Sequence, residues 1–531
     1  MRNETLTLRQ KQCDFDPEYD RLLQSISITV PTQRIELDID ITDKATLPAI
    51  IETALLLVAQ IEAVSETELG NFFGLNSHEC DVLVSQLVDS GLVKYDDKGD
   101  LVSTAKLRAQ RRAGATDNGI EIEEVKNFQT YTHIDRVTGH IQPRNDKASA
   151  SSLYSLPMLD RSHNEKDYSL LISEQWTRFK ETLPDNHALK RPQARLYRVN
   201  RATAMHSASP LAISINVHAM HDPLRGIRLD TRLVEDNDDN ATLLQRSGLV
   251  GHAVEWLAHR NIDSPSSTMQ DYCDIAHDNV IGRYIKNDVD GQYLDISRLL
   301  YDRTQKHTGY GNKHIEMLIG PSYAPGNNNR DKIMHWMKRQ PKNMRWHQAI
   351  WLGADNQLFG ASLGFESFIK ELNNELTQGE RNSAVNLLFK LELGYEGYNR
   401  NRDLHNIYNE RVNKRLFSYN KGKQESHLEM MVLPGQNGCA FIQYHARLDP
   451  RLGLEGLTMP IGYWTTDPER VSALWNTLRS RIKDQVTDFN CDTPNEAINN
   501  QLLCESDKLD KMLVAQIDKK MQALMERFNN N

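Results

Sequence analysis

Every second residue is apolar from Ile26 to Val30 and again from Ile35 to Ile41, with Pro31 between the two runs. Successive side chains of a strand point to opposite faces, so this alternation predicts strands with one buried face. We therefore expect residues 1–45 to form a leader of two short strands around Pro31, packed on the domain that follows.

Residues 46–113 carry a helical pattern that ends in a hairpin. The stretch Leu47–Ile61 is apolar and of helical length. Ser65-Glu66-Thr67-Glu68 is a capping box and Asn76-Ser77-His78-Glu79 is a second capping signal, because these side chains satisfy backbone donors that the first helical turn leaves free. The stretch 92–102 then predicts two strands joined by a tight turn.

Three helices and a hairpin of these lengths resemble the winged helix-turn-helix family, which implies a domain that binds DNA or another protein. The third helix would expose mainly acidic and neutral side chains, namely His78, Glu79, Asp81, Gln86 and Asp89. Such a surface repels phosphates, whereas duplex affinity depends on neutralising them. The nearest cations follow the hairpin at Lys106, Arg108, Arg111 and Arg112. DNA contact through the hairpin and these cations, and protein contact in place of DNA contact, both remain open.

From residue 114 onwards, helical and strand patterns alternate. Residues 114–165 are a polar connector with one predicted hairpin and a hinge, residues 166–295 and 296–486 mix helices with short strands as α/β or α+β domains do, and residues 487–531 are a C-terminal helical segment. Expected helices include 243–259 and 468–486. The last segment carries an apolar stripe that needs a partner: Leu509, Leu513, Ile517, Leu524 and Phe528.

The expected fold class is therefore a multi-domain α/β (α+β) chain. It has an N-terminal winged helix, a mixed α/β body and a C-terminal helix.

Two segments of the domain at 296–486 place a histidine near polar residues. His347 precedes Asp355 and Ser362, and His445 precedes Arg447 and Asp449. The order resembles half-sites of the phospholipase D superfamily. The resemblance implies that one histidine attacks phosphorus, the other protonates the leaving group and cations hold the phosphate.

Both half-sites depart from that pattern. Ala349 stands at the lysine position of the first and Arg447 at that of the second, while Asp355 falls one residue late and Asp449 too early. The resemblance thus implies a degenerate domain with little catalysis. In the alternative interpretation, His347 is a strand-edge histidine of an unrelated α/β domain.

The net charge of −9 confines nucleic-acid binding to local patches. One patch interleaves cations with tryptophans, and its cations are Arg330, Lys332, Lys338, Arg339, Lys342 and Arg345. A second alternates cations with tyrosines and includes Arg411, Lys414 and Arg415. Cations follow a phosphate backbone and aromatic faces stack on bases, which favours single-stranded or distorted nucleic acid. The alternative is a solvated helix face with core aromatics.

Other features exclude several classes. The chain has no apolar run of membrane-spanning length and no signal peptide, so we expect a cytoplasmic protein without a membrane partner. Its six cysteines are far apart and no close Cys/His cluster occurs, so we expect no metal. No nucleotide-binding motif occurs, and we expect no cofactor.

These patterns lead to one hypothesis with two alternatives. The first is a nucleic-acid-binding accessory subunit, with DNA favoured, of a bacterial DNA-processing or anti-phage defence system, acting with a separate ATPase or nuclease. The alternatives are a phosphodiesterase or nuclease that uses His347 and His445, and a protein-interaction scaffold.

Overall fold

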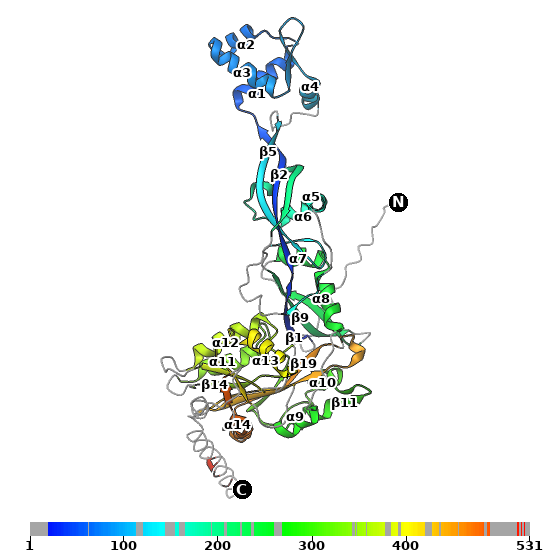
Figure 1. The fold of residues 1–531 in the computed structure, drawn as a ribbon, viewed down its shortest axis with the longest axis vertical. Coiled ribbons are helices and arrows are strands. Elements are labelled where there is room, and N and C mark those ends of the chain that lie inside the picture. The colour runs from blue at the N-terminus through cyan, green and yellow to red at the C-terminus, as the bar shows by residue number, and fades with distance from the viewer. Residues whose placement is uncertain are drawn as a thin grey trace.

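A computed structural model arranges the chain as a small helical head, a ribbon of strands and a broad body (Figure 1). The structure describes residues 20–488, together with residues 518, 519, 522 and 525; the gaps are 62, 113–120, 144–153, 159–164, 193, 206–209, 223–225, 235–237, 260–267, 342–345, 347, 357, 377–383, 391–394, 420–426, 435–436, 455 and 483–485. The apolar stripe expected between Leu509 and Phe528 lies outside the described residues.

The head comprises α1 (Ala49–Gln60), α2 (Glu66–Phe73), α3 (Ser77–Asp89), β3 (Val93–Tyr95), β4 (Leu101–Ser103) and α4 (Ala105–Arg112). Both expected capping boxes are present. The side chains of Ser65 and Asn76 accept a hydrogen bond from the backbone N–H of the third helical residue, and the carboxylates of Glu68 and Glu79 accept one from the backbone N–H of Ser65 and Asn76. The three helices and the hairpin predicted from the sequence are therefore confirmed. The core of the head lies between α1, α3 and the hairpin and includes Leu55, Val58, Leu83, Leu87 and Leu101.

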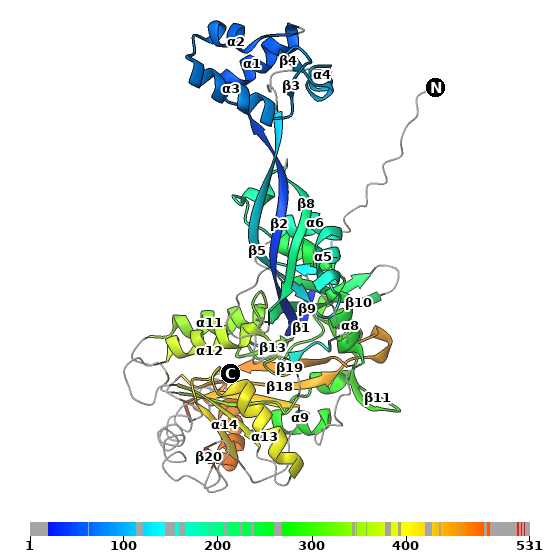
Figure 2. The same cartoon turned by 45° about the horizontal axis from the view of Figure 1, so that its top comes forward.

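A long two-stranded ribbon carries the head. β2 (Thr32–Thr46) leads into it and β5 (Glu121–Asp135) returns from it, and the two strands pair antiparallel from Thr32–Asp135 to Thr46–Glu121. Fifteen residues of strand span about 50 Å. Figure 2 shows the twisted ribbon between head and body.

The lower part of the ribbon belongs to a four-stranded sheet in the order β6-β5-β2-β8, with β6 (Ile141–Gln142) and β8 (Arg195–Ala204) at its edges. Helices α5 (Glu165–Glu174) and α6 (Trp176–Glu181) and the short helix η2 (Ala188–Lys190) cover one face. The alternating apolar residues of β2, from Ile35 to Ile41, are buried there against Phe179 and Leu189. The alternation of apolar and polar residues in the sequence therefore predicted the buried face of β2 correctly.

β1 (Arg21–Val30) precedes the ribbon and joins a second four-stranded sheet, β10-β9-β1-β7, with β7 (Tyr154–Ser155), β9 (Leu211–Asp222) and β10 (Gly226–Val234). The expected helix 243–259 is two helices, α7 (Asp238–Arg246) and α8 (Leu249–Ala258). Gly248 between them has a φ of 76°, a left-handed conformation that ends the first helix.

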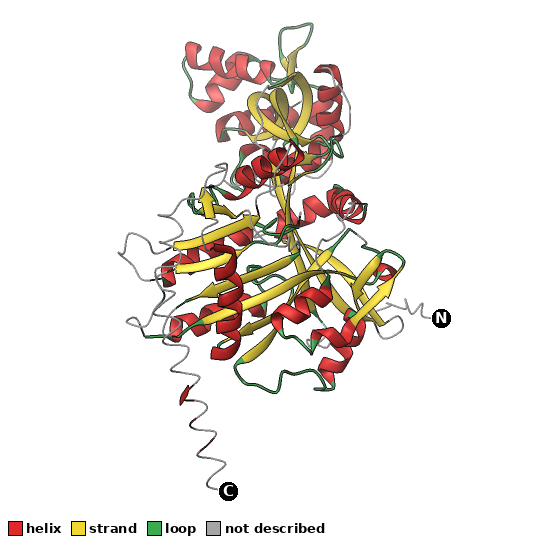
Figure 3. Cartoon of the chain, turned by 60° about the horizontal axis from the view of Figure 1, so that its bottom comes forward, coloured by secondary structure: helices red, strands yellow, loops and turns green. Residues whose placement is uncertain are grey.

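The body is built on a mixed eight-stranded sheet in the order β13-β19-β18-β17-β14-β15-β16-β20 (Figure 3). Its strands are β13 (Ile315–Ile319), β14 (Gln348–Leu352), β15 (Ala384–Lys390), β16 (Leu416–Tyr419), β17 (Leu428–Leu433), β18 (Cys439–Arg447), β19 (Thr458–Thr465) and β20 (Val486–Asp488). The expected helix 468–486 ends at Ile482, and Val486 begins β20 instead.

Helices cover both faces of this sheet. On one face α11 (Asn328–Arg339), α12 (Leu363–Glu375) and α13 (Tyr395–Tyr408) enclose an aromatic-rich core. On the other face lie α9 (Met269–Ala276), α10 (Ile296–Thr304) and α14 (Pro468–Ile482), with a core that continues into the sheet of β1. The hairpin β11 (Ile285–Asp288) and β12 (Gly291–Leu294) and the short helices η3 (Ile281–Tyr284) and η5 (Pro450–Leu452) complete the body.

The expected multi-domain mixed α/β fold class is confirmed. Among the described residues, no helix combines the length and the apolar character needed to cross a membrane.

Candidate nucleic-acid interface

The outward face of α3 is acidic, as the sequence predicted. Its buried positions are apolar and pack into the head. Its exposed side chains carry three negative charges and no lysine or arginine, and include His78, Glu79, Asp81, Gln86 and Asp89. A helix with this surface cannot enter a groove lined by phosphates without repulsion.

Cations of the head lie after α3, on the hairpin and on α4. Lys106 and Arg108 are exposed on α4, and Lys94 on β3 and Lys98 in the hairpin turn are exposed as well. Within the described part of the head, none of these four side chains forms an ion pair. Arg108 donates from Nε to the carbonyl oxygen of Thr104 at 3.4 Å, which leaves its charge uncompensated.

The cations of α4 were expected from the sequence, whereas those of the hairpin were not. Arg111 and Arg112 belong to the last turn of α4, and their side chains lie outside the described part. Lys94 and Lys98 could have been found from their positions, one on the outward side of a short strand and the other in an exposed turn.

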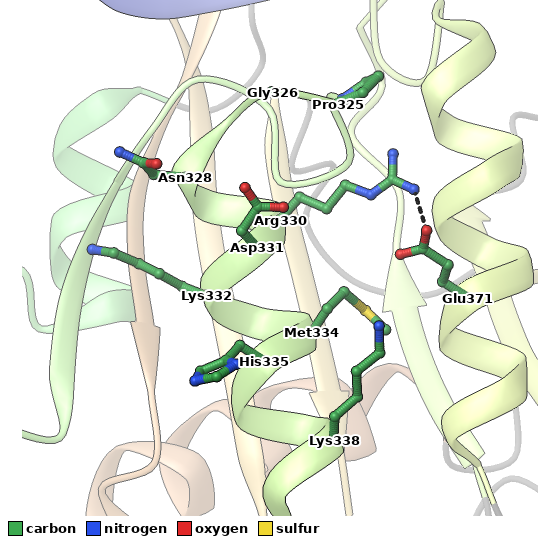
Figure 4. Close-up of a pocket in the computed structure, with 10 residues that line it drawn as sticks. All are labelled: Pro325, Gly326, Asn328, Arg330, Asp331, Lys332, Met334, His335, Lys338 and Glu371. Atoms are coloured by element: carbon green, nitrogen blue, oxygen red, sulfur yellow. Dashed lines mark hydrogen bonds and ion pairs between the residues drawn. The ribbon is translucent and has the colours of Figure 1, made fainter. Parts of the chain in front are cut away.

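The first basic patch of the body lies on α11, beside a cleft of 680 Å³ against α12 (Figure 4). Arg330 is buried and pairs with Glu371 of α12 at 2.7 Å, and Lys332 pairs with Glu316 of β13 at 2.8 Å. Lys338 and Arg339 are exposed, and no ion pair involves them among the described residues. Half of these four charges are therefore already neutralised within the protein.

The aromatic residues of this patch lie in the core. Trp346 is buried, its ring centroid is 5.4 Å from that of Trp336, and Trp336 also meets Trp464 of β19 at 5.5 Å. Trp346 is therefore unavailable for stacking on a base, in agreement with the alternative interpretation. Lys342 and Arg345 lie outside the described residues.

The second basic patch is divided by burial. Arg411 is buried, and its guanidinium donates to the carbonyl oxygen of Gly360 at 2.5 Å. Lys414 is exposed, and Arg415 is half-buried before β16. Arg411 thus stabilises the loop before α12, and Lys414 remains the accessible cation of the three.

His445 lies inside the body, on β18. Neither its side chain nor that of Glu429 on β17 is exposed, and Nε2 of His445 is 2.8 Å from Oε2 of Glu429. Trp351 donates to the other carboxylate oxygen at 3.2 Å, and the ring of Phe359 lies 6.0 Å from the imidazole. A substrate phosphate has no access to this histidine in the folded protein.

The cation expected to hold a phosphate near His445 is bound by other groups. Arg447, two residues along β18, donates to the carbonyl oxygen of Asp290 at 2.9 Å and pairs with Asp288 at 3.6 Å. His347 lies outside the described residues. Burial, with a smaller contribution from His445, lowers the pKa of His427 to about 4, so this histidine is neutral at physiological pH.

The described residues contain no cluster of three or more side chains of the types that hold a metal. Asp38 and Asp40 of β2 come closest to an acidic site, but amides of Asn127 and Asn200 bind both carboxylates, and Arg198 pairs with Asp40 at 2.8 Å. The hydrogen bond from Asn127 is the largest cause that lowers the pKa of each aspartate, followed by that from Asn200 for Asp38 and that from Arg198 for Asp40.

No protein-family model matches the chain, and no curated protein matches it. Among solved structures, it aligns with that of TrmBL2, an archaeal chromatin protein whose structure "shows a novel mode of DNA binding". The identity is 7%, the alignment covers 83% of this chain and 94% of that chain, and the TM-score is 0.21. A likeness at this level does not establish a shared fold.

Proposed function

We propose that this chain binds nucleic acid, DNA in the first place, and that the head is a winged helix-turn-helix module held away from the body by its ribbon. The observation that supports the proposal best is the pair of exposed cations on α4, Lys106 and Arg108, which form no ion pair among the described residues and lie beside an acidic α3. The hairpin adds Lys94 and Lys98, of which Lys98 is attracted by Asp96. The hairpin is then the wing. Phosphates would be contacted by the wing and α4, and α3 would face away from the duplex.

Charge reversal on α4 tests the proposal. The double variant Lys106→Glu/Arg108→Glu should weaken binding to a fluorescein-labelled duplex at least about tenfold, measured by anisotropy, and should lower the slope of log affinity against log salt by about 2. A matched control, Lys306→Glu/Lys313→Glu, makes the same charge change on exposed lysines of the body that form no ion pair among the described residues. Equal losses in both variants would contradict a role for the head.

A second variant separates the two faces of the head. Asp81→Lys/Asp89→Lys removes negative charge from α3 and leaves the capping box of Asn76 and Glu79 intact. If the wing and α4 contact phosphate, this variant should retain or modestly improve affinity with the same sequence preference. A new sequence preference would indicate that α3 reads the groove, which the proposal does not expect.

A protein-interaction scaffold is the second candidate, and a specific observation favours it. The head exposes large apolar side chains on its helices: Ile50 and Leu56 on α1, Phe72 on α2 and Val82 on α3. Exposed apolar side chains of this size on a small module are available for a protein contact. Indifference of the full chain to every nucleic acid tested would favour this function.

An enzyme that uses His445 is disfavoured by the complete burial of its side chain. Assignment to a DNA-processing or anti-phage defence system, with a separate ATPase or nuclease, and a cytoplasmic location stay predictions from the sequence.

A further inference from the structure

A cleft of 780 Å³ lies between α6 and the edge strand β8, in a part of the chain where sequence patterns indicated no site. Its volume is in the range of small-molecule sites. One wall is α6, with Trp176 and Lys180, and the opposite wall is β8, with Arg195 and Tyr197. Figure 2 shows β8 beside α5 and α6, below the head.

The local fold explains why Tyr197 faces outward. Arg198 pairs with Asp40 of β2 and Leu196 pairs with Ile41, so Tyr197 is the extra residue of a bulge in β8. A bulge turns the extra side chain away from the regular alternation of the strand. Tyr197 is 62% exposed, which is unusual for an aromatic residue beside a core strand.

The cleft has uncompensated positive charge. Arg195 is exposed, and within the described residues no acid pairs with it. Lys180 is half-buried and donates to the carbonyl oxygens of Arg191 and Ala194 at 2.8 and 3.1 Å, and no carboxylate of the described residues pairs with it. Glu181, the acid at the rim, is 3.7 Å from Arg246.

Two other cations of the cleft are neutralised. Lys190 pairs with Asp185 at 2.6 Å, and Arg198 pairs with Asp40 at 2.8 Å. The unbalanced charge is therefore concentrated on Lys180 and Arg195, next to Trp176 and Tyr197. Among the described strands only β2 pairs with β8, so one row of β8 backbone groups is not used in the sheet.

We propose that this cleft binds a nucleotide, with its phosphate on Arg195 and Lys180 and its base against Tyr197. Aromatic faces stack on every base, and paired cations hold phosphate oxygens. The nucleotide is either free or part of a single strand, and both share this chemistry. The proposal is independent of duplex binding by the head.

Calorimetry with the full chain tests the cleft, using AMP, adenosine and inorganic phosphate, and anisotropy with labelled dA8 adds the single strand. AMP and dA8 should bind, and phosphate alone should bind at least tenfold more weakly than AMP. Affinity for dA8 at least tenfold above that for AMP assigns the site to a strand, and equal affinities assign it to a free nucleotide.

Variants then locate the binding. Arg195→Glu and Tyr197→Ala should each weaken AMP and dA8 at least tenfold, while Tyr197→Phe, which keeps the ring, should bind like the wild type. The matched control is Arg201→Glu, an exposed arginine of β8 that does not line the cleft. These side chains are exposed, so folding should be unaffected, which thermal melts by circular dichroism would verify.

Two results would overturn the proposal: affinities unchanged by Arg195→Glu and Tyr197→Ala, or phosphate that binds as tightly as AMP. Lys106→Glu/Arg108→Glu should leave AMP affinity unchanged. Failure of the duplex proposal is thereby distinguished from failure of this one.

Discussion

The side chains of His445 and Glu429 form a hydrogen-bonded pair on neighbouring strands, in a place that solvent does not reach. Removal of one partner from such a pair leaves the other buried and unsatisfied, at a cost of about 3–5 kcal/mol. We therefore expect the pair to contribute to the stability of the sheet.

We expect Glu429→Ala to lower the free energy of unfolding by about 3–5 kcal/mol, measured by urea titration. Glu429→Gln keeps an acceptor for the imidazole N–H and should lower it clearly less. If both variants unfold at the same urea concentration as the wild type, the pair does not contribute to stability, and the prediction is wrong.

The buried His427 predicts an effect of pH on stability. Its pKa falls from 6.5 to about 4 in the folded protein, so between these values the unfolded chain binds a proton that the folded chain does not. The titration of His427 therefore has no effect on stability above pH 7. As the pH decreases through 6.5 it lowers the free energy of unfolding, by about 3 kcal/mol near pH 4.

The contribution of His427 can be isolated by comparing unfolding at pH 7 and pH 4.5 in the wild type and in His427→Asn. Asparagine tolerates the positive φ of 70° at this position and does not titrate. The variant should lose less stability between the two pH values. An identical loss in both proteins would assign the effect to other groups.

Strand β1 is the element that ties the ribbon to the body. Ser27 donates its backbone N–H to the carbonyl oxygen of Ala361 at 2.7 Å, and Gln24 donates to that of Thr458 at 3.0 Å. Gly320 lies so close that a Cβ atom there would be 2.1 Å from the carbonyl oxygen of Leu22. Docking of β1 thus requires a glycine at position 320.

Gly320→Ala should destabilise the protein more than Gly326→Ala, by about 1–3 kcal/mol of unfolding free energy. Both glycines have positive φ, 81° and 73°, so both variants incur backbone strain of about 1–2 kcal/mol. Only the alanine at 320 would also meet the backbone of β1, because no atom lies within 4 Å at 326. If the two variants are destabilised equally in urea titrations, β1 can move away from an alanine at position 320, and its docking does not require a glycine there.

Elements specified by neighbouring residues were predictable from the sequence. The capping boxes at Ser65 and Asn76 act over three residues, and the alternation from Ile35 to Ile41 reports one buried face. Burial of Arg411 and His445 was not predictable, because it depends on strands and loops distant in the chain. The cleft between α6 and β8 likewise depends on a bulge that no local pattern announces.

At the scale of the whole molecule, the head is an insertion between two strands that pair along their full length. β2 and β5 can close on each other without it, because Thr46 and Glu121 are paired at the tip of the ribbon. The head has its own core, separate from those of the body. We therefore expect the body to fold without the head.

The most direct test of duplex binding through the head replaces residues 47–120 with an Asn-Gly turn, which suits a two-residue hairpin. Thermal melting should show a folded body, and affinity for a labelled duplex should fall at least about tenfold with a smaller salt slope. A headless chain that is folded and binds duplex as tightly as the full chain, with the same salt slope, would contradict the account.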